Sequence, residues 1–301
     1  MQNGLRQEIL SDIEAIVKDE KLFIERNFII RTQAMDDIEF HVIDRIQSLR
    51  ENADSCVQLN DLIQYAEKVK SLLSEVNTKM FQKLREQISR GNYRGQALMN
   101  LLNEYLEQQP AHQRYQTGYD DVDLFLNGLL TYHELPAEIR EREPGMIYYQ
   151  KTPARIVVEL IKKAAFQSCD VFYDLGSGLG QVTLMVNLLT TALTKGVEFE
   201  SAYCNYAKSI VADLNLRDVD FINADARYAD YSSGTIFFMY TPFEGEILKN
   251  VLQKLYVEAK KRKIRIFTYG SCTIEITRLE WLRQLNEIQN ASIELAEFVS
   301  V

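Results

Sequence analysis

One short stretch of the sequence places an acid, closely spaced glycines and a second acid in an order that suits ligand binding. Asp174 ends an apolar run, and Gly176, Gly178 and Gly180 follow at alternate positions. Glycines this close together allow a sharp turn and let backbone N–H groups approach a ligand without a Cβ in the way. Glu198 ends a second apolar run further along. The pattern predicts a site that holds a small polar ligand between a glycine turn and carboxylates.

Three elements must position these residues. The apolar, β-prone residues 171–173 predict a buried strand that the glycines end. Residues 181–194 carry apolar side chains with helical recurrence and predict a helix, and residues 196–199 predict a second strand. Strand, glycine turn, helix and strand form the nucleotide-binding βαβ unit, in which Glu198 is placed to bind ribose hydroxyls.

The spacing of the glycines separates two classes of ligand. Dinucleotide enzymes use G-x-G-x-x-G, because a pyrophosphate lies on the helix N-terminus. This chain has G-x-G-x-G, and Asp174 two residues before the first glycine would repel a pyrophosphate. A carboxylate there suits a ligand with a cationic amino-acid end, such as S-adenosylmethionine. A nicotinamide-dependent oxidoreductase is a weaker alternative, because the glycine spacing disfavours it. The other alternative is an ordinary glycine-rich turn in some other α/β protein.

The segment Asp174–Gln181, DLGSGLGQ, resembles motif I of class I S-adenosylmethionine-dependent methyltransferases. In detail it is most similar to the non-SET histone-lysine methyltransferases, the disruptor-of-telomeric-silencing family. The resemblance covers about residues 148–301 and says nothing about residues 1–120. It implies an α/β fold with a seven-stranded Rossmann-like sheet, S-adenosylmethionine as the cofactor, and methyl transfer to an acceptor.

The resemblance also implies which residues bind the cofactor. Tyr149 and Thr152 match a Tyr-x-x-Thr segment that folds over the methionine end in this family, although a helix cap and a packed tyrosine are equally good explanations. Asp225 matches the acid that accepts the adenine amino group, with a turn-forming role as its alternative. The expected cofactor-binding residues are Tyr149, Thr152, Asp174, Gly176, Ser177, Gly178, Gly180, Gln181, Glu198, Asp225 and Ala226.

The acceptor end departs from the family pattern. The family carries two asparagines where this chain has Met239 and Tyr240, so the amide that holds the acceptor is missing. Tyr240 and Tyr149 are the expected catalytic residues, and no clear general base is present. Protein lysine, another amine and a small metabolite all remain open as acceptors. The alternative is a catalytically inactive S-adenosylmethionine-binding protein whose helical region binds a partner.

The rest of the chain divides into two predicted regions. Residues 1–114 read as an all-helical domain of four or five helices, because apolar residues recur at helical spacing and no proline occurs before Pro110. Residues 115–301 form the expected methyltransferase domain. Further strands are predicted at 219–222, 235–240 and 264–269, and a closing hairpin over 279–285 and 292–299 completes seven strands.

Composition excludes several classes of protein. The net charge is −9 and there is no basic arm, which argues against a nucleic-acid partner and against a nucleosomal substrate. The four cysteines and three histidines are scattered, so we expect no metal site. No apolar run approaches a membrane span, and the first ten residues lack the apolar stretch of a signal peptide. We therefore expect a cytoplasmic protein without membrane contact, whose oligomeric state the sequence leaves open.

Overall fold

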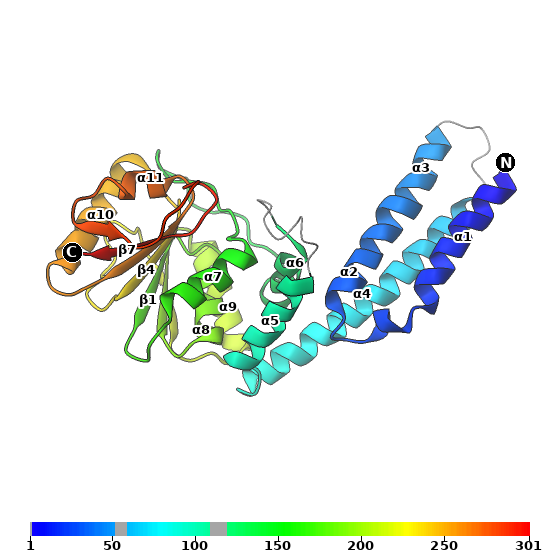
Figure 1. Cartoon of the computed structure of the whole chain (residues 1–301), viewed down its shortest axis with the longest axis horizontal. Coiled ribbons are helices and arrows are strands. Elements are labelled where there is room, and N and C mark those ends of the chain that lie inside the picture. The colour runs from blue at the N-terminus through cyan, green and yellow to red at the C-terminus, as the bar shows by residue number, and fades with distance from the viewer. Residues whose placement is uncertain (1, 52–58, 109–118) are drawn as a thin grey trace.

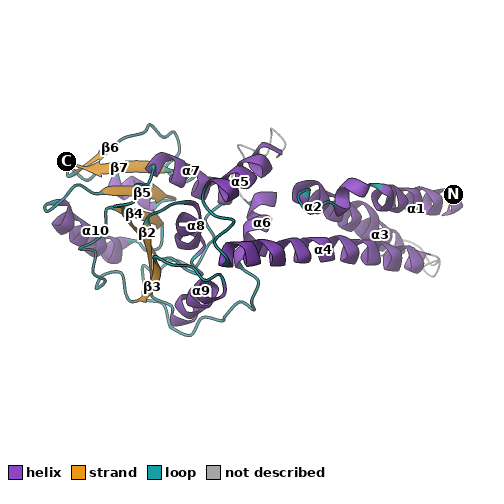
Figure 2. Ribbon diagram, turned by 90° about the horizontal axis from the view of Figure 1, so that it is seen from below, coloured by secondary structure: helices purple, strands orange, loops and turns teal. Residues whose placement is uncertain are grey.

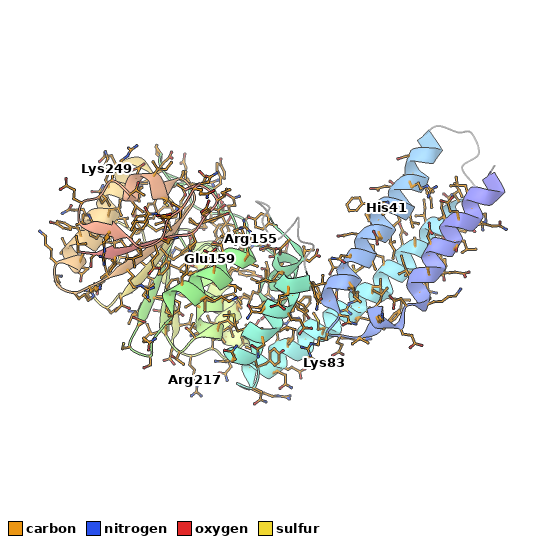
Figure 3. All side chains as sticks on the ribbon, viewed as in Figure 1. His41, Lys83, Arg155, Glu159, Arg217 and Lys249 are labelled. Carbon is orange, nitrogen blue, oxygen red and sulfur yellow. The ribbon has the colours of Figure 1, made fainter. Side chains whose placement is uncertain are left out.

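The computed structural model describes residues 2–51, 59–108 and 119–301, and it has two parts of different build (Figure 1). One part is a sheet covered by helices, and the other is an arm of helices that extends away from it. His41 lies on this arm, whereas Lys249 lies at the opposite end of the molecule (Figure 3). The predicted boundary between residues 114 and 115 lies outside the described residues and stays a prediction.

The sheet confirms the predicted architecture. In the described part of the chain it has seven strands in the order β3-β2-β1-β4-β5-β7-β6. Strands β1 to β5 pair in parallel, and β7 runs antiparallel between β5 and β6. The strands are β1 (Val171–Leu175), β2 (Leu193–Glu198), β3 (Val219–Asn223), β4 (Ile236–Tyr240), β5 (Arg265–Tyr269), β6 (Leu282–Gln284) and β7 (Ala296–Ser300).

Helices connect these strands and cover both faces of the sheet (Figure 2). Their apolar side chains gather in two cores, one shared with α7, α8 and α9 and the other with α10 and α11. The five helices are α7 (Ala154–Ala164), α8 (Gln181–Leu189), α9 (Ser201–Asp213), α10 (Gly245–Ala259) and α11 (Cys272–Ile276). A parallel sheet with helices on both faces exposes its carboxyl-end loops for ligand binding.

One helix is shorter than the sequence predicts. Residues 181–194 were expected to be helical, but α8 ends at Leu189, where Thr190 takes up an extended backbone. The Thr190 hydroxyl donates to the Val186 carbonyl and accepts from the Ala192 N–H, which closes the helix end. β2 therefore begins at Leu193 instead of residue 196, and its residues 193–197 pair with β1.

The arm has its own apolar core. Its helices pack through side chains such as Ile13, Ile38 and Leu73, all fully buried. The long helix α4 runs from this arm to the sheet region, where α5 and α6 pack beside it (Figures 1 and 2). The elements before the sheet are α1 (Gln2–Lys18), the 3-10 turn η1 (Glu20–Phe23), α2 (Phe28–Asp37), the π-helical segment η2 (Ile38–Ile43), α3 (Asp44–Glu51), α4 (Asn60–Ser89), α5 (Gln96–Gln108) and α6 (Asp121–Leu130).

Asp123 joins the helical region to the site. Its carboxylate accepts from the Asp120 N–H at 2.9 Å within a capping box, and from the Ala154 N–H at the start of α7 at 2.7 Å. The expected alternative role of Thr152 as the N-cap of α7 is wrong, because Pro153 holds that position and makes no side-chain cap. Asp123 supplies the missing acceptor from another helix.

The contact between α4 and α6 yields a test of the fold. A Cβ added to Gly128 would lie 2.1 Å from the Phe81 ring, which is itself buried among other aromatic rings. We predict that Gly128→Ala lowers the free energy of unfolding by about 1–3 kcal/mol through overpacking. The control Gly4→Ala has open space in α1 and should be neutral or raise stability by up to ~1 kcal/mol. Urea unfolding measures both, and an unchanged Gly128→Ala midpoint contradicts the packing described.

Candidate functional site

A pocket lies at the carboxyl ends of β1, β2, β3 and β4. Its volume is about 1060 Å³ with the open solvent at its mouth included. Of the residues predicted for the site, all except Gly178 and Gly180 line it. The predicted residues on its wall are Tyr149, Thr152, Asp174, Gly176, Ser177, Gln181, Glu198, Asp225, Ala226 and Tyr240.

The glycines of the turn between β1 and α8 have no room for a Cβ. Gly178 has a φ of +53°, and a Cβ there would lie 2.2 Å from the Tyr149 ring. At Gly176, with a φ of +79°, a Cβ would lie 2.3 Å from Pro242. Left-handed backbone of this kind favours glycine in any case. Gly178 and Gly180 therefore shape the turn and its neighbours, while the pocket wall is made by the residues beside them.

Asp174 is a buried carboxyl group that faces the pocket. Only 3% of the residue is exposed, and the Thr183 hydroxyl donates to it at 2.9 Å. Burial raises the pKa of Asp174 to about 7, and the nearby Glu198 adds to this shift. A cation in the pocket would stabilise the ionised form, because an opposite charge offsets the cost of burial.

Glu198 lies across the turn from Asp174. Its two oxygens accept from the Gly178 N–H and from the Glu200 N–H, each at 2.7 Å. Burial raises the pKa of Glu198 although these hydrogen bonds oppose the shift. The backbone of the turn thus fixes this carboxylate at the end of β2, on the pocket wall.

Four buried polar atoms on the wall have no hydrogen-bond partner among the described residues. They are the Arg142 Nη1, the Tyr149 hydroxyl, the Ser177 Oγ and the Gln181 Oε1. Burying such atoms without partners is unfavourable, and native proteins rarely do so without a ligand, an ion or a water. Together with the two acids, these atoms fit a ligand that brings several donors and acceptors.

Asp225 lies just beyond β3 and is already ion-paired. Arg227 donates to it from the backbone N–H at 2.8 Å and from its guanidinium, and also reaches Glu143 at 2.7 Å. Burial alone would raise the pKa of Asp225, but these hydrogen bonds outweigh it and hold the pKa below its usual range. Asp225 therefore stays ionised at neutral pH as a hydrogen-bond acceptor on the wall.

The end of β4 and the residues after it form a further part of the pocket wall. Side chains of β4 alternate, so Met239 enters the core under α10 while Tyr240 reaches the pocket. Burial raises the pKa of Tyr240 to about 12, and its ring lies 4.7 Å from that of Tyr269. Thr241, next in the chain, has a φ of +34°. Tyr240 is thus a protonated hydroxyl at neutral pH, able to donate or accept but not to act as a base.

The sequence predicted a loop around Pro136, Pro144 and Gly145, but not that this loop forms the outer wall of the pocket. Residues 134–150, here called the strap, supply Glu138, Arg140 and Arg142 to the pocket in addition to Tyr149. The strap is held by Glu200, whose carboxylate accepts from the Ile139 N–H at 3.0 Å and the Arg140 N–H at 2.8 Å. The prolines and the glycine of the strap indicate only a loop. The contacts of the strap with Glu200, about 60 positions further along the sequence, leave no local pattern from which its place could be predicted.

Fold and site together define an α/β protein with a Rossmann-like, seven-stranded sheet and a pocket at the carboxyl ends of its parallel strands. Residues 144–221, from the end of the strap into β3, match the model of the family described as histone methylation protein DOT1. This confirms the resemblance that the glycine turn indicated, over those residues. No curated protein matches the chain.

Solved structures that resemble the chain cover about half of it. An RNA methyltransferase from Salinibacter ruber, in complex with S-adenosyl-L-homocysteine, is 18% identical over 50% of this chain and 92% of its own, with a TM-score of 0.39. A putative methyltransferase from Escherichia coli is 15% identical over 50% and 88%, with a TM-score of 0.42. A precorrin-6y methyltransferase from Geobacter metallireducens is 13% identical over 52% and 93%, with a TM-score of 0.38. The order of the strands, β3-β2-β1-β4-β5-β7-β6, defines the fold.

Within residues 2–51, 59–108 and 119–301, no cluster of His, Cys, Asp and Glu is arranged to hold a metal ion. In the same ranges no helix combines the length and apolar character needed to cross a membrane.

Proteolysis can test whether the hydrogen bonds from the strap to Glu200 keep the strap in place. Glu200→Ala leaves the N–H groups of Ile139 and Arg140 without their acceptor, at a cost of about 1–2 kcal/mol. We predict about tenfold faster tryptic cleavage after Arg140 and Arg142, because local opening exposes the strap. Glu134→Ala, an exposed residue of the same strap, is the control. Cleavage at the wild-type rate in Glu200→Ala would show that other contacts hold the strap.

Proposed function

We propose that this protein is an S-adenosylmethionine-dependent methyltransferase that binds its cofactor in the pocket at the carboxyl edge of the sheet. The observation that carries the proposal is the pair of acids, buried Asp174 and half-buried Glu198, on either side of a turn whose glycines have no room for a Cβ. The match to the methylating family includes this turn and supports the same conclusion.

Different parts of the pocket wall suit the methionine, the ribose and the adenine of the cofactor. Asp174 would bind the ammonium group of the methionine, with Gln181 and Ser177 as polar partners and Tyr149 and Thr152 folded over it. Glu198 would accept from the ribose hydroxyls at the end of β2. Asp225 and Ala226 would contact the adenine, where an ionised acid accepts from the exocyclic amine.

The residues at the reacting end favour a neutral amine as the acceptor, in a protein lysine or in a small molecule. S-adenosylmethionine, when bound, supplies an electrophilic methyl group on a sulfonium. Tyr149 and Tyr240 both have pKa values raised by burial, so neither hydroxyl removes a proton at neutral pH. Their rings exclude water, and the Tyr240 hydroxyl orients the acceptor through a hydrogen bond.

The alternative, a cofactor-binding protein without transfer activity, has no observation in its favour. Replacement of the family's asparagines leaves a hydrogen-bonding group, Tyr240, on the pocket wall. Labelled methyl transfer from S-adenosylmethionine into extract fractions distinguishes the two. We expect a labelled acceptor that is lost with Tyr240→Leu but kept with Tyr256→Leu, whose ring packs on Trp281 away from the pocket residues. No labelled acceptor from a protein that binds the cofactor would support the inactive alternative.

Calorimetric titration with S-adenosylhomocysteine tests the cofactor site. We predict that Asp174→Asn and Glu198→Gln each weaken binding by at least about tenfold, because each removes a charge-assisted hydrogen bond. Glu244→Gln changes an exposed carboxylate and serves as the control. Equal affinity in all four proteins would mean that the acids do not bind the ligand.

Binding should also depend on pH through Asp174. Without ligand, burial gives this carboxyl a pKa of about 7, so it carries a proton below that pH. An ammonium group binds the carboxylate, so affinity should fall toward tenfold per unit as the pH drops below about 7, with release of a proton on binding. Titrations in buffers of different ionisation enthalpy measure the proton. Affinity that is constant between about pH 6 and pH 8 contradicts the role of Asp174, and Asp174→Asn should remove the dependence.

A further inference from the structure

One side of α6 contacts the segment that leads from the strap into α7. Asp123 and Asn127 are four residues apart and therefore project from the same face of the helix. The Asn127 side-chain oxygen accepts from the Lys151 Nζ at 2.6 Å. The Asp123 carboxylate accepts from the Ala154 N–H at 2.7 Å. Tyr119, two residues before the helix, donates to the Lys151 carbonyl at 2.7 Å, so three hydrogen bonds join this short segment to α6 and its N-terminal flank.

The same segment, residues 151–154, is here called the linker, and it also forms part of the pocket wall. Gln150 and Thr152 line the pocket, whereas the side chain of Lys151 between them reaches α6. The Thr152 carbonyl accepts from the Gln181 side chain at 3.3 Å, which joins the linker to the start of α8. The linker therefore contacts α6 through one residue and the pocket through the next.

Tyr149, two residues before the linker, lies at the Asp174 part of the pocket. Its ring fills the space beside Gly178, where a Cβ would lie 2.2 Å from it. Burial raises the pKa of the Tyr149 hydroxyl, and the nearby Tyr119 and Asp174 add to the shift. The contacts that fix the linker thus act beside the carboxylate to which the proposed function assigns the methionine ammonium group.

Other residues of α6 pack on the helical region. The Phe125 ring lies 5.5 Å from that of Phe28 in α2 and 5.5 Å from that of Phe81 in α4. Arg85 of α4 donates to the Gly128 carbonyl at 2.7 Å. Because α2 and α4 continue into the arm, the helices of the arm hold the element that holds the linker (Figure 1).

We propose that Tyr119, Asp123 and Asn127 are positioning residues for cofactor binding. Through the linker they hold Tyr149 and Thr152 over the methionine end. The inference rests on the proposed function and gives the helical region a part in binding the cofactor, because α6 is itself held by α2 and α4.

The hydrogen bond between Asn127 and Lys151 joins two side chains, so it can be removed without a change in the backbone. Calorimetry with two ligands tests its role: S-adenosylhomocysteine carries the amino-acid end of the cofactor, and 5′-methylthioadenosine lacks it. We expect Asn127→Ala to weaken S-adenosylhomocysteine by about three- to tenfold, as the loss of one hydrogen bond implies, and to leave 5′-methylthioadenosine unchanged. Asn127→Asp should restore the affinity, because a carboxylate also accepts from the lysine.

A second Lys–Asn hydrogen bond provides the matched control. Lys162 of α7 donates to the Asn103 side chain of α5 at 2.7 Å, and neither of these two described residues lines the pocket. Asn103→Ala removes the same kind of contact with the same helical region and should leave the affinity for both ligands unchanged. Adding Lys151→Met to Asn127→Ala should cause no further loss, because both changes remove one hydrogen bond.

Each other outcome has a distinct meaning. Equal weakening of both ligands in Asn127→Ala, or an equal loss in Asn103→Ala, would overturn the inference, because it would show a general effect on the fold. Unchanged binding of S-adenosylhomocysteine in Asn127→Ala would overturn it as well, while leaving the proposed function intact. A folded wild-type protein that binds neither ligand would overturn the proposed function and this inference together.

Discussion

The glycine turn between β1 and α8 is the constraint on which the site depends. Its backbone is left-handed at Gly176, Gly178 and Gly180, and a neighbouring group fills the place of each missing Cβ. Those groups come from the strap, from β3 and from the loop after β4, so the turn is where the walls of the pocket meet. A side chain at any of these positions would separate the walls.

Electrostatics add a second constraint. Asp174 is buried and Glu198 is half-buried, and the loss of contact with water raises the pKa of each. Such an arrangement opposes the ionised state of the free protein and favours a ligand that brings positive charge. Perturbed acids on the wall of a cleft are typical of functional sites. The arginines of the strap, Arg140 and Arg142, bring positive charge to the wall of the same pocket.

Local patterns in the sequence predicted the sheet, the turn and its two acids, because each is encoded by neighbouring residues. The end of α8 was predicted five residues too late, since its apolar spacing continues through Thr190, whose side chain closes the helix. The role of Glu200 and the orientation of Met239 depend on contacts between distant segments and on strand register, neither of which spacing encodes. The same holds for the arm, whose helices were expected but whose extension away from the sheet was not (Figure 1).

The most direct measurement is a crystal structure of the protein with S-adenosylhomocysteine. We predict that the amino-acid end lies at Asp174, the ribose hydroxyls on Glu198, and the adenine beside Asp225. Ligand density elsewhere on the molecule, or a pocket without ligand at saturating concentration and with the strap closed as described, would contradict the assignment of this pocket to the cofactor.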